Sequence, residues 1–142
     1  MPPAGIIDTG AIIAIVDASE LWHHACLDAL ASLPLPLLTT EAILTELFHL
    51  IAARNLSVDK AWRFVLSGAI LVRPVADSDL SALQDLMARY KDRPMDFADA
   101  TLVLLAARES LSVILTVDHD DFETYRIGGR KRFTVLPARE RK

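Results

Sequence analysis

Four acidic residues stand where a folded chain rarely places a charge. Asp8 and Asp118 each close a short apolar run, at residues 6–7 and 113–117, while Glu46 and Asp99 lie within the largely apolar segments 42–53 and 95–100. A carboxylate against apolar surface is unfavourable unless positive charge pairs with it. Converging carboxylates also repel one another, so the expected partner is a hard divalent cation such as Mg²⁺ or Mn²⁺. These residues therefore indicate metal-assisted chemistry on phosphate.

The elements that must position these residues alternate between strands and helices. Apolar runs predict strands at 6–7, 35–39, 69–73, 113–117 and 133–136. Helical periodicity and caps predict helices at 10–16, 21–33, 41–54, 58–67, 78–91 and 96–109, with a helical turn at 118–125 and a tight turn at 128–129. Thr40, Ser57 and Ser78 are suitable N-caps. Strands separated by helices favour an α/β fold with a parallel sheet covered on both faces.

This arrangement would bring the carboxylates to one place. Asp8 and Asp118 follow the carboxyl ends of predicted strands, and in an open parallel sheet ligands bind beyond those ends. Asp96 and Asp99 are three residues apart, so they share a face of the first helical turn if both are helical. Glu46 is expected near the edge of the core. Taken singly, Asp8 and Asp96 could be helix caps, Asp118 a turn residue and Glu46 a solvent-facing acid, but these readings do not explain why one rim collects them all.

The composition fits one globular domain over residues 1–142. The chain is 52% hydrophobic and 24% charged, and no apolar stretch reaches the ~18 residues of a membrane helix. No Lys or Arg precedes the apolar N-terminal segment, so it is a poor signal peptide. The single cysteine, Cys26, cannot form an internal disulfide, which fits a cytoplasmic location.

The positive charge is concentrated toward the C-terminus. Residues 126–142, predicted as a basic C-terminal strand and tail, carry seven basic residues and one acid. Such a tail could reach nucleic-acid phosphates, or it could be a solvated end or an arm for an acidic partner. Arg89, Lys91 and Arg93 could likewise hold phosphates, but pairing with Asp92 and Asp96 is slightly favoured.

Four segments together resemble the acidic motifs of PIN-domain nucleases, and most closely those of the VapC-type toxin ribonucleases of bacterial toxin–antitoxin systems. They are Ile7-Asp8-Thr9-Gly10-Ala11, Thr45-Glu46-Leu47, Met95-Asp96-Phe97-Ala98-Asp99-Ala100 and Leu115-Thr116-Val117-Asp118-His119-Asp120-Asp121-Phe122. The resemblance covers essentially the whole chain, in the same order. It implies a three-layer α/β/α sandwich with a parallel sheet of about five strands.

The resemblance also implies the site and its partners. The catalytic tetrad falls on Asp8, Glu46, Asp99 and Asp118, and these four with Asp96 are the implied ligands of Mg²⁺ or Mn²⁺. The implied substrate is RNA, with a homodimeric assembly and, for the toxin branch, a cognate antitoxin. Asp120 and Asp121 make the fourth motif richer in acid, so the ligand there stays open, and His119 could contact the substrate or lie on the surface.

The expected activity is therefore metal-dependent endoribonucleolytic hydrolysis of RNA phosphodiester bonds, as the toxin of a toxin–antitoxin pair. The alternatives are an RNA-processing nuclease that is not a toxin, or a PIN-fold interaction module without activity. A phosphoaspartyl phosphatase is disfavoured because Gly10 stands where a second Asp would be needed. A receiver domain is disfavoured because its mid-chain Asp and its late Lys are not found.

Overall fold

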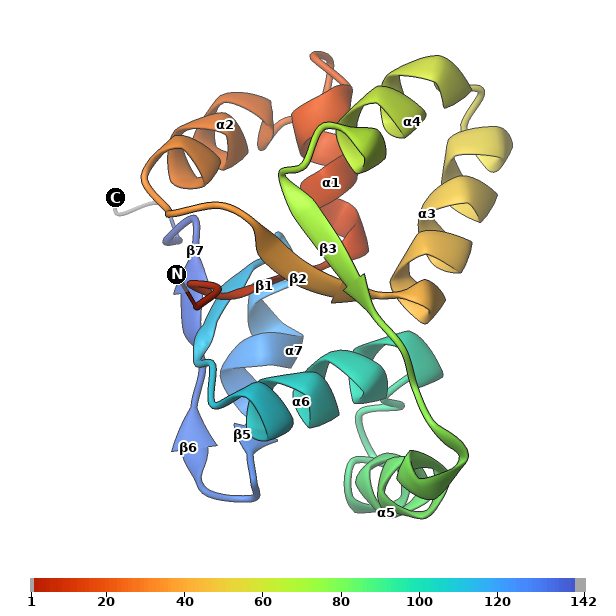
Figure 1. The fold of residues 1–142 in the computed structure, drawn as a ribbon, viewed down its shortest axis with the longest axis vertical. Coiled ribbons are helices and arrows are strands. Elements are labelled where there is room, and N and C mark those ends of the chain that lie inside the picture. The colour runs from red at the N-terminus through yellow and green to blue at the C-terminus, as the bar shows by residue number, and fades with distance from the viewer. Residues whose placement is uncertain (1, 140–142) are drawn as a thin grey trace.

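A five-stranded, all-parallel sheet forms the centre of the computed structural model, which describes residues 2–139. The strand order is β3-β2-β1-β4-β7 (Figure 1). The strands are β1 (Ile6–Ile7), β2 (Leu37–Thr40), β3 (Ile70–Arg73), β4 (Val113–Leu115) and β7 (Thr134–Leu136). From β1 the chain adds strands outward on one side and then returns to add β4 and β7 on the other. The strand order therefore reverses between β1 and β4, where ligands bind in open α/β sheets.

Helices cover both faces of this sheet, which confirms the three-layer α/β/α sandwich. Figure 1 shows α1, α2 and α4 above the sheet, α5 and α6 below it, and α3 to its right, where it continues from the end of β2. The helices are α1 (Thr9–Val16), α2 (His23–Ala31), α3 (Glu41–Ala53), α4 (Val58–Leu66), α5 (Leu80–Arg89), α6 (Phe97–Glu109) and α7 (His119–Thr124). Within residues 2–139, no helix is both long and apolar enough to cross a membrane.

Side-chain caps explain where several helices begin. The Thr40 hydroxyl accepts a hydrogen bond from the Ile43 amide, and the Ser57 hydroxyl accepts one from the Lys60 amide, as the sequence predicted. Ser78 is not a cap, because it lies inside a 3₁₀ turn, Asp77–Asp79, that precedes α5. There the Asp79 carboxylate instead accepts a hydrogen bond from the Ala76 amide.

The core lies between the sheet and the helices that pack on it. α6 is buried over most of its length, because small residues such as Ala100 and Ala106 let it approach its neighbours closely. A buried hydroxyl pair, Thr40 with Thr101 at 2.8 Å, ties the end of β2 to α6. This bond satisfies both polar groups in the interior and fixes α6 relative to the carboxyl ends of the strands.

The structure differs from the sequence-based expectation at some element ends. The strand expected at 113–117 ends at Leu115, and the helix expected at 21–33 is shorter, spanning His23–Ala31. The predicted turn at Gly128 and Gly129 is confirmed, since both have positive φ angles of 60° and 79°. It joins two unpredicted antiparallel strands, β5 (Arg126–Ile127) and β6 (Lys131–Arg132). The basic tail thus contains structured elements, and its last residues, 140–142, lie outside the described part.

Candidate active site

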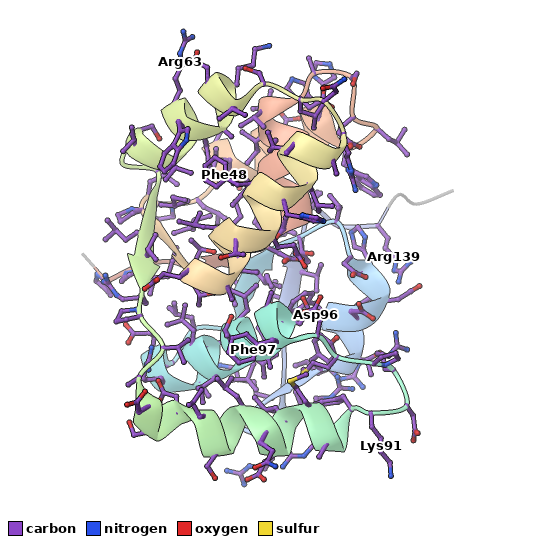
Figure 2. The ribbon with its side chains drawn as sticks, turned by 90° about the vertical axis from the view of Figure 1, so that its right-hand side faces the viewer. Phe48, Arg63, Lys91, Asp96, Phe97 and Arg139 are labelled. Carbon is purple, nitrogen blue, oxygen red and sulfur yellow. The ribbon has the colours of Figure 1, made fainter. Side chains whose placement is uncertain are left out.

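The predicted carboxylates line one cavity of about 390 Å³. Its walls come from segments that are far apart in the sequence, and Figure 2 shows Asp96 and Phe97 at the start of α6, below α3. The acidic side chains that line it are Asp8, Glu46, Asp96, Asp99, Asp118 and Asp121. Because β1 and β4 are neighbours, Asp8 and Asp118 reach it from the point where the strand order reverses.

Asp8 is both the N-cap of α1 and a buried member of this cavity. One carboxylate oxygen accepts a hydrogen bond from the Thr9 amide at 2.8 Å, and the other accepts one from the Thr116 hydroxyl at 2.9 Å. The residue is only 6% exposed. Burial raises its pKa to about 7, the hydrogen bonds from Thr116 and Thr9 oppose that rise, and the charges of Glu46 and Asp118 add to it. Each carboxylate oxygen can accept about two hydrogen bonds, so both retain capacity for a further partner.

Asp96 and Asp99 form the lower wall in a way the sequence only partly predicted. Asp96 is not helical, because it is the N-cap of α6 and accepts a hydrogen bond from the Asp99 amide at 2.8 Å. Its interpretation as a cap is confirmed, although its side chain also lines the cavity. Asp99 is buried and accepts a hydrogen bond from the Tyr125 hydroxyl at 3.0 Å. Burial first, and then the charges of Asp8 and Asp96, raise the pKa of Asp99 to about 8.

Asp118 immediately precedes α7, and it lies two residues after Thr116, whose hydroxyl donates to Asp8. Its amide donates to the Thr116 hydroxyl at 3.0 Å, so Thr116 bridges Asp8 and the Asp118 backbone. The residue is exposed overall, yet its carboxylate is partly buried beside Asp121. Burial and the neighbouring Asp121 raise the pKa of Asp118 to about 6.

Glu46 reaches the cavity from α3 and is half-buried, as expected for a residue at the edge of the core. Leu50 and Arg54 also line the cavity. The three residues follow at intervals of four, so they share one face of the helix. Arg54, whose side chain pairs with Glu20 at 3.3 Å, was not predicted at the site, but this spacing was a signal that could have found it.

The chemistry of this donor set fits a hard divalent cation. The cavity presents carboxylate oxygens from several elements, and three of these groups have pKa values raised partly by their acidic neighbours. Among residues 2–139, no three His, Cys, Asp or Glu side chains form a closed metal-binding cluster. Mg²⁺ does not require one, because it retains several waters and contacts one or two carboxylates directly. The residues therefore suit a largely hydrated ion.

The two additional acids of the fourth motif have different surroundings. Asp121 lines the cavity and pairs with Arg93 at 3.1 Å. Asp120 is exposed and pairs with Arg139 near the C-terminus. Arg93 therefore has a carboxylate partner, but it is Asp121 and not the expected Asp92 or Asp96. Asp121 is the additional acid at the site.

The surroundings of two aromatic residues, His119 within the fourth motif and Tyr125 after it, were not predicted from the sequence. His119 is not a surface residue, because it is buried and its Nε2 lies 2.8 Å from the Pro137 carbonyl oxygen. Tyr125 is fully buried and holds Asp99 through its hydroxyl. No sequence pattern identified Tyr125, because its role depends on the packing of α7 against α6.

Comparison with known proteins adds independent findings. The family model described as PIN domain matches residues 6–127. Ribonuclease VapC26 of Mycobacterium tuberculosis (strain ATCC 25618 / H37Rv) is 33% identical over 135 residues, which cover 93% of this chain and 99% of that protein. The crystal structure of Mycobacterium tuberculosis VapC20, a Sarcin-Ricin loop cleaving toxin, superposes with a TM-score of 0.73 at 22% identity, covering 82% of this chain and 91% of that one. At that identity the likeness to VapC20 concerns the fold.

Proposed function

This chain belongs to the PIN domain family, and from that premise we propose that it is a metal-dependent endoribonuclease of the VapC type that hydrolyses RNA phosphodiester bonds. The observation that carries the proposal is the cavity in which Asp8, Glu46, Asp99 and Asp118 meet at the reversal of strand order. The ribonuclease activity named for the relative VapC26 supports it.

These four residues are the proposed catalytic carboxylates, and with Asp96 they would hold Mg²⁺ or Mn²⁺. When bound, such an ion lowers the pKa of water and neutralises charge on phosphate oxygens. The protein's own part is to hold its carboxylates in position. Thr116 orients Asp8, and Tyr125 orients Asp99, each by donating a hydrogen bond to one carboxylate oxygen.

We further propose an assembly and a setting for this enzyme. A homodimer is supported by the exposed apolar side chains of α4, where Trp62 is 45% and Leu66 is 76% exposed. A cognate antitoxin is supported by the family relationship to VapC proteins. A cytoplasmic location is supported by Cys26, which is free and buried.

Cleavage of a pool of structured RNAs in Mg²⁺ and in Mn²⁺ tests the activity. Wild type should cut in both metals and not in EDTA, and Asp8→Asn should lose cleavage while remaining folded. Asp17→Asn is the matched control, because Asp17 caps the other end of α1 and bonds to Ser19 away from the cavity. If Asp8→Asn retains wild-type cleavage, the catalytic site is elsewhere. If wild type cuts no RNA in either metal, the binding-module alternative is favoured.

A further inference from the structure

A second cavity adjoins the carboxylate cavity. It has a volume of about 570 Å³ and is lined by Arg89, Tyr90, Asp92, Arg93, Asp121 and Thr124. Asp121 lines both cavities, so the two share a wall. The second one, called the arginine cavity below, contains none of the proposed catalytic carboxylates. It is of a size that takes a small-molecule ligand.

The shared wall is the ion pair between Arg93 and Asp121, in which another anion can take the place of the Asp121 carboxylate. The Arg93 guanidinium lies 3.1 Å from the Asp121 carboxylate, and their side chains are 39% and 26% exposed. Ion pairs this open contribute about 0–1 kcal/mol to stability, so exchanging the Asp121 carboxylate for a phosphate is nearly neutral for the fold. The planar guanidinium also suits phosphate, because it donates two parallel hydrogen bonds.

Two neighbouring side chains extend this surface. Arg89 ends α5 and brings a second guanidinium to the same cavity, where it lies against Gly129 of the β5–β6 turn. Tyr90 is held rigidly, because its hydroxyl accepts a hydrogen bond from the Arg126 amide at 2.9 Å and its ring packs edge-on against Tyr125. Arginines beside a fixed aromatic ring are the features with which proteins bind single-stranded nucleic acid.

We propose that the arginine cavity binds the nucleotide of single-stranded RNA next to the phosphate that lies in the carboxylate cavity. Arg93 and Arg89 bind backbone phosphate, and the Tyr90 ring stacks on the base. The inference rests on the proposed function, because that function places RNA in the adjoining cavity. It makes the Arg93–Asp121 pair a contact that substrate opens, with Asp121 occupying the phosphate position in the free protein.

This exchange predicts opposite effects for the two halves of one ion pair. Arg93→Gln removes a phosphate contact and should weaken RNA binding about 5–10-fold, with the slope of log K against log salt reduced by about 0.7 for a single strand. Asp121→Asn removes the competing anion and should tighten binding a few-fold. Arg63→Gln is the matched control, because Arg63 also pairs with an aspartate, Asp59, at 2.9 Å on the exposed face of α4.

Fluorescence anisotropy with a labelled, unstructured RNA oligonucleotide measures these effects in EDTA. Without metal the RNA stays intact, so the binding result is independent of whether the carboxylate cavity supports cleavage. Tyr90→Leu should weaken binding more than Tyr90→Phe, which keeps the ring and loses only the hydroxyl that accepts from the Arg126 amide. Circular dichroism checks that each variant is folded. The proposal is overturned if wild type does not bind, if Arg93→Gln binds like Arg63→Gln, or if Arg93→Gln and Asp121→Asn weaken binding equally.

Discussion

Replacing Asp8 by Asn should stabilise the metal-free protein at alkaline pH while abolishing its activity. Asp8 is buried, and its pKa rises from an ordinary 3.8 to about 7. Below about pH 4 the group is protonated in both the folded and the unfolded state, so it has no effect on stability. As the pH rises, the Asp8 carboxyl ionises first in the unfolded chain, and this lowers the free energy of unfolding. The decrease continues until Asp8 also ionises in the folded protein, near pH 7. The penalty is then complete, at about 4 kcal/mol for a shift of about 3 units.

The asparagine avoids this penalty but loses part of one hydrogen bond. Its amide oxygen can still accept from the Thr9 amide, so the helix cap is kept. Its NH₂ group faces the Thr116 hydroxyl, which donates to Asp8 in the wild type. That hydroxyl must turn, which costs the variant about 1 kcal/mol of stability. Asp8→Asn should therefore be more stable than wild type by about 2–3 kcal/mol near pH 8 and within about 1 kcal/mol of it near pH 5.

Urea unfolding in EDTA, followed by tryptophan fluorescence at both pH values, measures this difference. Asp17→Asn serves as the control, because hydrogen bonds from Ser19 lower the pKa of Asp17, so its replacement should not become more favourable as the pH rises. If Asp8→Asn is no more stable than wild type near pH 8, or if the difference does not change with pH, the assignment of Asp8 as a buried, destabilising carboxylate is wrong.

Three further predictions concern the same network. Mg²⁺ or Mn²⁺ should raise the melting temperature of wild type near pH 8 more than near pH 5, because protons compete with the metal ion for the carboxylates. Equal shifts of the melting temperature at both pH values would contradict this. Tyr125→Phe keeps the ring but removes the hydroxyl bonded to Asp99. Mn²⁺ affinity should fall about 10-fold, while the free energy of unfolding should change by less than about 1.5 kcal/mol. An unchanged Mn²⁺ titration would show that the bond has no effect on the site. Thr116→Val removes both the donor to Asp8 and the acceptor for the Asp118 amide, so urea unfolding should show that the free energy of unfolding falls by about 1–3 kcal/mol. Thr116→Ser keeps the hydroxyl and is the control. Equal stability of the two variants would refute the bridging role.

Much of the fold could be predicted because local and long-range preferences agree. The main-sheet strands are short apolar runs, and caps such as Thr40 and Ser57 mark where helices begin. Asp8 and Asp118 were predicted at one rim, since that inference needs only the parallel direction of their strands. The strands of the β5–β6 hairpin were missed because each has only two residues and they are mostly charged, so they form no apolar run.

The site could be predicted as a set of acids but not as a network. The sequence predicted cap and cavity roles for Asp96 as alternatives, and the structure combines them, because a capping carboxylate uses one oxygen for the helix. The partners of Asp99 and Asp121, which are Tyr125 and Arg93, lie at least 26 residues away along the chain. Such pairs depend on how α6, α7 and the α5–α6 connection pack, and no local pattern encodes that packing.

The residues that form the site are far apart along the chain, and this has a consequence during protein synthesis. Asp8 receives its bond from Thr116, 108 residues later, and β4, which brings Thr116 to that position, is itself flanked by β7 close to the C-terminus. A growing chain therefore lacks a complete carboxylate cavity until β4 and β7 have left the ribosome. For an enzyme that cuts RNA, this order keeps the site incomplete while the earlier elements fold.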